Sequence, residues 1–462
     1  MKRILFLLLV CGLTLWATTA LAEELTLDQA VQLALKNNQL LQAAQQDTAA
    51  AQWGFRRSIS GWLPHASFQW AWEHPDPRTF DRADQGFRAT QSLGGAGTGT
   101  GTSLTGTGSS AQRTLYRDNY SNQFQIVQPL FNASTEYLAI RSGSINERVA
   151  RLTELDQALQ LTRNVKQAYY AAAQNYALIG VARESLSLAQ ESLRLSQARV
   201  EVGQAAQSEV LRWEAEVANA EGALVGAENT YSQAMMALAH LIGASYDQKY
   251  ELTALPQNVT PAELATAEQS AGAGAQTPLS VDRHPAVAAA RGNIDLAEVE
   301  YERTWGSMLP SANFTYTYDW QTDDTPWPHG VRSWTMGVGV SIPIFQGFGA
   351  VTGMEQTDHQ VSSARLRVED VKRTLLQQAY AARLNLHAAR VQVDSGQKAV
   401  KSAAANLDLV KSQMEVGIAT LLQLLDAELT RRNAESTLIT AMANFHTALA
   451  DWEYLTAQAP AD

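Results

Sequence analysis

Histidine is the side chain most often used for metal binding and proton transfer, and its placement here favours neither. The eight histidines are scattered, and none falls into an HExxH or HxH arrangement. Asp358 and His359 are adjacent in a stretch predicted to be one long helix, where neighbouring side chains point about 100° apart. They are interpreted as surface polar residues. The pattern predicts a protein that is not an enzyme, with no bound metal and no other cofactor.

A glycine-rich tract from Gly94 to Gly108 is the segment most easily mistaken for a phosphate-binding loop. It lacks the Lys-Ser/Thr pair that completes such a loop, and it lies between two predicted strands. Its Gly, Thr and Ser composition is typical of flexible chain. Residues 92–112 are therefore interpreted as an external loop.

The N-terminal segment is typical of a secretory signal peptide. Lys2 and Arg3 provide a basic start, residues 4–16 form an apolar core, and the sequence Ala20-Leu21-Ala22 has small residues at the two cleavage positions. The apolar stretch is shorter than the ~20 residues of a spanning helix, which disfavours a transmembrane anchor. We expect residues 1–22 to be removed and the mature chain to begin near Glu23.

The net charge argues against nucleic-acid binding, and the cysteine content argues against thiol chemistry. The net charge of −11 over 462 residues argues against nucleic acid as a partner, because phosphate binding requires a basic face. The single cysteine, Cys11, lies within the expected signal peptide. Val10 precedes it where a lipid-attachment site expects a small residue, and the apolar stretch continues past it. The mature chain therefore uses neither disulfides nor thiolate sites.

An internal duplication organises the rest of the chain. Three short motifs each occur twice. The distance between the two copies is the same for the second and third motifs, but about 32 residues longer for the first, and this excess lies in the loop 92–112. We divide the chain into a first repeat (23–242), a linker (243–282) and a second repeat (283–462). The motifs are Trp62-Leu63-Pro64 and Met308-Leu309-Pro310, residues 127–131 and 341–345, and Glu201-Val202-Gly203 and Glu415-Val416-Gly417.

Four segments alternate between aromatic or aliphatic residues and small or polar ones. They are residues 68–72, 120–126, 314–320 and 333–342. This period of two predicts strands with one apolar and one wet face, as in a transmembrane β-barrel. A soluble, half-buried sheet is the alternative. Membrane barrels begin at about eight strands, and lipid tolerates no open sheet edge. If these four strands span a membrane, several chains must therefore share one barrel, and three would supply twelve strands.

Two stretches of about 70 residues, 132–202 and 346–416, contain no proline. As helices each would span roughly 105 Å, which is too long for a globular core. From Val361 to Met414, apolar and alanine residues recur at alternating steps of three and four, as in a coiled coil. Two shorter helices, residues 27–62 and 204–242, together match the length of one long helix. We expect them to stack antiparallel to it.

In this order the motifs resemble the outer-membrane efflux protein family of TolC-like channels, over nearly the whole mature chain. The resemblance implies a mainly α fold with a transmembrane β part: a trimeric 12-stranded β-barrel, with four strands per chain, continuing into a long periplasmic α-helical barrel. The family pattern has prolines at its helix–strand junctions, which here are Pro64, Pro129, Pro310 and Pro343.

The resemblance also implies a function and partners. It predicts the exit duct of a tripartite efflux or type I secretion system in the outer membrane of a Gram-negative bacterium. Its partners would be two further copies of the chain, outer-membrane lipid, a periplasmic adaptor (membrane fusion protein) and an inner-membrane pump of the RND, ABC or MFS type. The alternative is a periplasmic coiled-coil scaffold or adaptor, which would leave the four alternating strands unexplained.

Site residues are carried over from the family motif. Val202, Gly203, Val416 and Gly417 match the hairpin tips at which adaptors bind. They also match ordinary helix-ending turns, and the two roles do not exclude each other.

The periplasmic gate of the family has acids six and nine positions after the second tip glycine, where this chain has Gln423 and Asp426. Asp426 alone would provide a carboxylate ring, which selects for cations; a solvated acid on a helix face is the alternative. A family arginine is replaced by Ala419 opposite Glu209. That latch is absent, and Ser208 and Glu209 are expected to hydrogen-bond elsewhere.

Overall fold

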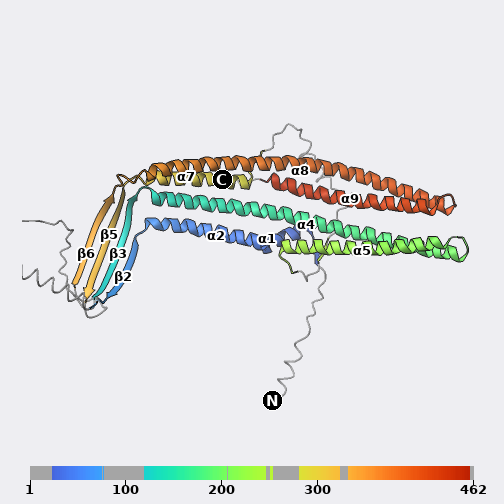
Figure 1. Ribbon diagram of the computed structural model, residues 1–462, viewed down its shortest axis with the longest axis horizontal. Coiled ribbons are helices and arrows are strands. Elements are labelled where there is room, and N and C mark those ends of the chain that lie inside the picture. The colour runs from blue at the N-terminus through green and yellow to red at the C-terminus, as the bar shows by residue number, and fades with distance from the viewer. Residues whose placement is uncertain are drawn as a thin grey trace, which may run out of the picture. The chain divides into compact units, whose positions relative to one another are not determined.

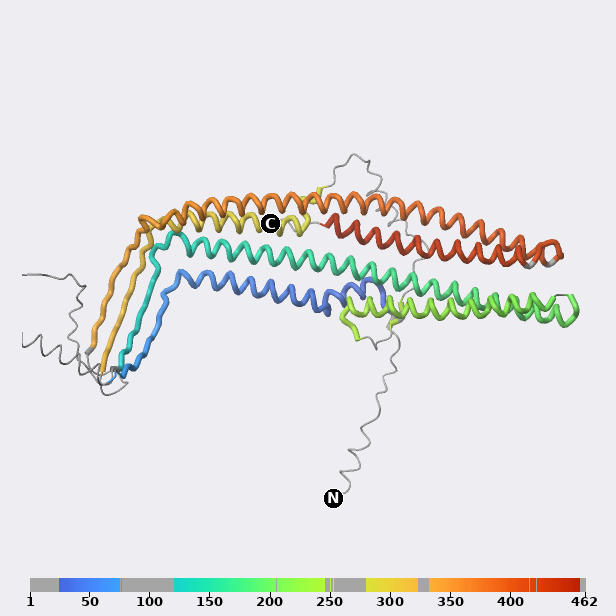
Figure 2. The backbone as a smooth tube through the Cα atoms, viewed as in Figure 1, coloured from blue at the N-terminus to red at the C-terminus, as the bar shows by residue number. Residues whose placement is uncertain are grey.

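The computed structural model describes residues 23–74, 76, 119–204, 206–245, 250–252, 280–322 and 331–457, and Figures 1 and 2 show the course of the chain. The expected signal peptide, the loop 92–112 and most of the linker 243–282 lie outside these residues. The chain forms two compact units. The first consists of Gln52–Asn146 and Asp295–Ser362, and the second of Met1–Ala51, Glu147–Ile294 and Ser363–Asp462.

The first unit contains a four-stranded antiparallel sheet, which confirms the four predicted strands. Its order is β2-β3-β5-β6. The strands are β2 (His65–Glu73), β3 (Asn119–Asn132), β5 (Ser311–Thr322) and β6 (Val331–Ser341). Among the described residues, β2 pairs only with β3 and β6 pairs only with β5. The two outer strands therefore each present an edge to which a further strand could hydrogen-bond.

The two faces of this sheet differ in chemistry, because side chains opposite each other in the register share a face. One row consists of Phe68, Phe124, Tyr318 and Trp334. The neighbouring row on the other face consists of Gln69, Gln123, Asp319 and Ser333. A hydrogen bond of 2.9 Å joins Gln123 Nε2 to Asp319 Oδ1. The apolar face is open, with Phe68 at 58% and Trp334 at 60% exposure.

Three of the four junction prolines lie at strand ends, and one does not. Pro64 and Pro310 directly precede β2 and β5, and Pro343 follows β6. Pro129 was expected at the end of its strand, but β3 continues past it to Asn132. The register with β5 shifts between Pro129 and Phe131, and β2 pairs no further than Val127. The proline therefore lies at a bulge, where its missing N–H does not break a regular ladder.

The predicted long helices are confirmed: α4 (Thr135–Glu201) and α8 (Gly349–Glu415) each have 67 residues. Two returning helices, α5 (Gln207–Ile242) and α9 (Leu421–Leu455), run back antiparallel to them (Figure 1). A further helix, α7 (Pro285–Gly306), precedes β5. Among the described helices, none has the length and apolarity required to span a membrane.

The hydrophobic core of the second unit follows the hairpins. One cluster joins α7, α8 and α9 around Val287, Leu386 and Phe445. Another joins α1, α4 and α5 around Ala34, Val165 and Leu238. Every position of the predicted seam between Val361 and Met414 is buried or half-buried. The coiled-coil prediction for α8 is therefore confirmed.

The expected single helix over residues 27–62 is wrong, because Asn38 interrupts it. The observed elements are α1 (Leu27–Asn37), α2 (Gln39–Ile59) and a short 3-10 turn at Ser60–Trp62. Asn38 has extended backbone, and its Oδ1 accepts from the N–H groups of Leu40 and Leu41 at 3.0 and 3.1 Å. It therefore caps the new helix, as asparagine commonly does.

The same asparagine joins two elements that are far apart in sequence. Its Nδ2 donates to the carbonyl of Leu241 at 2.9 Å, so the end of α5 meets the break between α1 and α2. A parallel pair of short strands, β1 (Glu23–Leu25) and β4 (Tyr250–Leu252), lies in the same unit. The contact between Asn38 and Leu241 supports the predicted stacking of two short helices along one long helix.

Candidate gate and docking site

Both hairpin tips close with the same backbone motif. At the first, the Gly203 N–H donates to Val200 at 3.0 Å and the Gln204 N–H donates to Arg199 at 2.8 Å. At the second, the Gly417 and Ile418 N–H groups donate to Met414 and Gln413 at 3.0 and 2.8 Å. This is the Schellman arrangement, which satisfies the last carbonyls of a helix and requires a left-handed residue.

Glycine meets that requirement at both tips. Gly203 and Gly417 have φ of 74° and 76°, and a Cβ added to either would meet nothing within 4 Å. Substitution is therefore limited by backbone conformation and not by space. The neighbouring Val202 and Val416 are 67% and 70% exposed. Each tip thus presents an apolar side chain to its surroundings.

Gln423, carried over as a gate position, is part of a helix cap. Thr420 is the N-cap of α9, and its backbone N–H donates to Gln423 Oε1 at 2.8 Å. The Gln423 N–H donates back to Thr420 Oγ1 at 3.4 Å. Thr-Leu-Leu-Gln is the capping-box sequence, so this role was readable from the spacing alone. The side chain that replaces the family acid therefore orders the start of α9.

The other carried-over positions lie in two places. Asp426 is an exposed residue of α9 that lines a pocket of about 300 Å³. Ser208 and Glu209 lie in the first turn of α5, where an acid is favourable to the helix dipole. The expected side-chain hydrogen bonds of Ser208 and Glu209 are not seen within the described ranges. The structure therefore brings Asp426 to the pocket, but not Gln423, Ser208 or Glu209.

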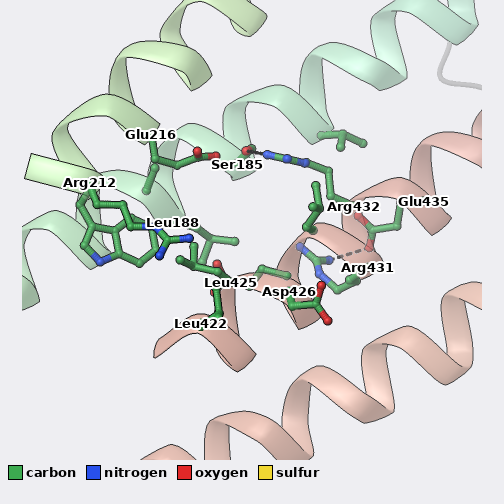
Figure 3. Close-up of a pocket in the computed structure, with 15 residues that line it drawn as sticks. Ser185, Leu188, Arg212, Glu216, Leu422, Leu425, Asp426, Arg431, Arg432 and Glu435 are labelled. Atoms are coloured by element: carbon green, nitrogen blue, oxygen red, sulfur yellow. Dashed lines mark hydrogen bonds and ion pairs between the residues drawn. The ribbon is translucent and has the colours of Figure 1, made fainter. Parts of the chain in front are cut away.

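Side chains from α4, α5 and α9 form this pocket (Figure 3). α4 contributes Ser185 and Leu188, and α5 contributes Arg212, Trp213 and Glu216. Trp213 is 2% exposed, and its Nε1 atom has no hydrogen-bond partner among the described residues. The remaining charged residues on α9, besides Asp426, are Glu428, Arg431, Arg432 and Glu435.

Two neighbouring arginines of α9 connect the second hairpin to the first. Arg431 lies between Glu435 on its own helix, at 2.6 Å, and Glu184 on α4, at 2.5 Å. The Arg432 Nη1 atom donates to Ser185 Oγ at 2.5 Å. Such charge-assisted hydrogen bonds are stronger than neutral ones. No single-sequence signal identified these residues, because Arg, Glu and Ser at helical spacing are typical of any exposed helix face.

Burial changes the proton affinity of two acids in the pocket. It raises the pKa of Glu428, and the cations Lys411, Arg431 and Arg432 partly offset that rise. Burial also raises the pKa of Glu435, with a further contribution from Glu184 and an opposing one from Arg431. The side chains at this end of the hairpins therefore form a charged network, part of which is withdrawn from water.

Comparison with known proteins agrees with this architecture. The family model described as "Outer membrane efflux protein" matches residues 79–244 and 277–456. The outer membrane efflux protein BepC of Brucella suis biovar 1 (strain 1330) is 27% identical over 225 residues, which cover 48% of this chain and 46% of BepC. TolC of Escherichia coli (strain K12) is 28% identical over 110 residues, covering 24% of this chain and 22% of TolC.

A solved outer membrane protein has the same fold. The outer membrane protein VceC of Vibrio cholerae superposes with a TM-score of 0.72 at 15% identity, covering 94% of this chain and 96% of VceC. The sequence matches span less than half the length of the two curated relatives, whereas the structural match spans nearly all of VceC. Because the family model covers most of the chain, the chain belongs to the outer membrane efflux protein family.

Proposed function

We propose that this chain is one protomer of a trimeric exit duct in the outer membrane of a Gram-negative bacterium. The duct conducts substrate passively from a periplasmic adaptor and an inner-membrane pump of the RND, ABC or MFS type to the exterior, in tripartite efflux or type I secretion. It has no catalytic activity and needs no cofactor. The two repeats, 23–242 and 283–462, are its halves, and the segment 243–282 links them.

The observation that carries this proposal is the four-stranded sheet. It has an exposed aromatic face, a polar face and two outer strands with a single partner each among the described residues. In lipid every backbone polar group requires a partner, so the edges of three such sheets would pair to close a barrel of twelve strands. The periplasmic scaffold finds less support, because a scaffold in water would not need an aromatic outer face.

The gate and the docking site are assigned within this proposal. Val202, Gly203, Val416 and Gly417 form the hairpin tips that contact the adaptor, and the exposed valines would supply its apolar contact. Asp426 provides one carboxylate per protomer at the gate. Gln423 contributes indirectly, by capping the helix that carries Asp426. Glu209, next to Ser208, favours the start of the returning helix α5 through the helix dipole.

Membrane fractionation combined with light scattering tests the proposal. The expected result is that the protein sediments with outer membranes, that only detergent extracts it, and that the extracted particle has the protein mass of three chains. A periplasmic monomer released without detergent would overturn the proposal and favour the scaffold.

A further inference from the structure

We infer that the contact between two copies of this chain repeats a contact already present inside it, that of β3 and α4 with β5 and α7. The inference rests on the proposed trimer and specifies how its copies join. Going around the sheet, β6 of one copy would meet β2 of the next. These two strands are the repeat equivalents of β3 and β5, so their pairing would reproduce the β3–β5 pairing.

The register of the sheet shows that the duplication is structural as well as sequential. His65 pairs with Val127 between β2 and β3, and Ser311 pairs with Ser341 between β5 and β6. These are equivalent positions of the two repeats, since the Trp-Leu-Pro and Met-Leu-Pro motifs directly precede β2 and β5. One pairing inside the chain therefore predicts the other to the residue.

The turns that lead from strand to long helix are equivalent in the same way. Ala133 and Ser134, before α4, have positive φ of 53° and 64°. Gly347 and Phe348, before α8, have positive φ of 60° and 61°. Two consecutive left-handed residues are rare outside glycine, so the shared conformation is specific. It directs α4 and α8 away from the sheet in the same manner.

Inside the chain, an ion pair joins α4 to α7 just beyond the sheet. The Arg141 Nη1 atom lies 2.7 Å from both carboxylate oxygens of Glu302. Nearby, a Cβ added to Gly306 at the end of α7 would lie 2.7 Å from the Ala133 carbonyl oxygen, so the backbones touch there. Together these two contacts fix the position of α7 along the axis of α4.

At the equivalent positions of the other two helices the charges are exchanged. The repeat equivalent of Arg141 is Glu355 on α8, and that of Glu302 is Arg56 on α2. Both are exposed, and the Glu355 side chain is 76% accessible. Within its chain Glu355 lies 3.6 Å from His359 of the same helix, and Arg56 lies over the Trp53 ring. The same geometry between copies would join Glu355 to Arg56 of the next chain with reversed polarity.

The strands can pair between copies in the same way. The repeat equivalents of Phe124 and Ile126 are Val338 and Val340, and those of Tyr318 and Tyr316 are Trp72 and Trp70. If the pairs Phe124–Tyr318 and Ile126–Tyr316 recur between copies, Val338 lies opposite Trp72, and Val340 opposite Trp70, of the next copy. All four side chains are more than half exposed in the single chain. They lie on the apolar face, so the transferred register sets apolar against apolar. A slip of one residue would instead set Val340 against a residue of the polar face.

Cysteine cross-linking tests the register directly. Val340→Cys is combined with Trp70→Cys in a chain whose only cysteine, Cys11, is replaced by serine. Inside one chain these positions lie on the two outer strands, and Trp70 is level with Arg332, eight residues along β6 from Val340. Three strand spacings alone separate them by about 14 Å, and the offset along the strands adds to this, so they are too far apart for a disulfide. Mild oxidation of the purified trimer should therefore give covalent dimers and trimers.

The matched control combines Val340→Cys with Ala66→Cys, which lies four residues along β2 and should give less than one tenth of the cross-link. A stronger cross-link at Ala66, or none at either position in a particle with the mass of three chains, would overturn the inferred register while leaving the duct intact. A particle with the mass of one chain would overturn the proposed function itself.

A charge exchange tests the ion pair. Glu355→Arg and Arg56→Glu should each lower the temperature at which the trimer dissociates in detergent, because each places like charges opposite each other. The double exchange should recover at least half of the loss, because it restores an attractive pair. Additive losses in the double variant would contradict the inference, since a merely structural role of either residue gives no recovery.

Discussion

Arg431 on α9 places its Nη2 atom 2.5 Å from Glu184 Oε1 on α4, and thereby joins the second helical hairpin to the first. The neighbouring Arg432 makes a second link to α4 through Ser185. Closer to the tips than Ser185 and Arg432, the described residues of the two hairpins share no further hydrogen bond or ion pair. Movement of the tips in the proposed gate would therefore be limited at these two arginines.

Replacement of Arg431 should loosen this joint. Arg431→Gln leaves the Glu184 and Glu435 carboxylates without their shared cation. Loss of a hydrogen bond to a charged group typically removes about 1–3 kcal/mol. We expect more frequent or larger channel openings in planar bilayers, with trimer mass unchanged. The matched control is Lys398→Gln, which breaks an exposed pair with Asp394 on α8 and should change nothing. Equal behaviour of the two variants would exclude the joint.

Substitution of the tip glycines should separate assembly from export. Gly417→Val or Gly203→Val forces a branched residue into a left-handed conformation, which costs roughly 1–3 kcal/mol. The variant should still insert as a trimer but lose export, because its tip no longer matches the adaptor. Gly226→Ala is the control, since Gly226 lies within α5 and a Cβ there meets nothing within 4 Å. Continued export by both tip variants would show that the tips are assigned wrongly.

Removal of the Asp426 carboxylate, which we propose lies at the gate, should reduce ion selectivity. Asp426→Asn deletes the charge but keeps the shape, so the trimer would lose one ring of three carboxylates. Reversal potentials in a salt gradient should show a weaker preference for cations, and polyvalent cations should block less. Asp408→Asn, at an exposed position of α8, serves as the comparison. If Asp426→Asn leaves selectivity unchanged, Asp426 is a solvated acid on a helix face.

The buried acid Glu428 should make stability depend on pH. Because burial raises its folded-state pKa above the ordinary 4.5, the folded protein holds the proton more tightly than the unfolded chain does. Its contribution is therefore fully present below pH 4.5 and is lost as pH rises through the raised pKa. Glu428→Gln should raise the unfolding temperature at pH 7. The variant should also gain less in unfolding temperature than the natural protein does when the pH falls from 7 to 5.

Circular dichroism at the two pH values measures this difference between the two proteins. The comparison is needed because His284 acts in the opposite direction. Burial lowers the pKa of His284, so its contribution is lost as pH falls below 6.5. Identical pH dependence in the variant and the natural protein would contradict a role for Glu428.

Elements that recur with a regular period were predictable from sequence. The strands alternate between apolar and polar residues because the sheet has two different faces, and this alternation located all four strands. The steps of three and four residues in α8 located the seam, because each apolar residue at that spacing lies on the same face of the helix. Both signals are local, and they require no knowledge of what the element packs against.

Features that depend on a partner distant in sequence were missed. The break at Asn38 depends on Leu241, which is distant in sequence and accepts its amide hydrogen bond. β3 continues past Pro129 because it still pairs with β5 there, although its pairing with β2 ends at Val127. In the candidate site, Asp426 was located through family spacing. Arg431 and Arg432 became recognisable only once α4 and α9 were side by side.

Single-channel conductance of the purified, detergent-extracted protein tests the central claim most directly. If the chain is a protomer of a trimeric outer-membrane duct, insertion into a planar bilayer should give small, cation-selective and voltage-sensitive openings. A protein that never conducts, although light scattering of the same sample shows folded trimers, would contradict the account.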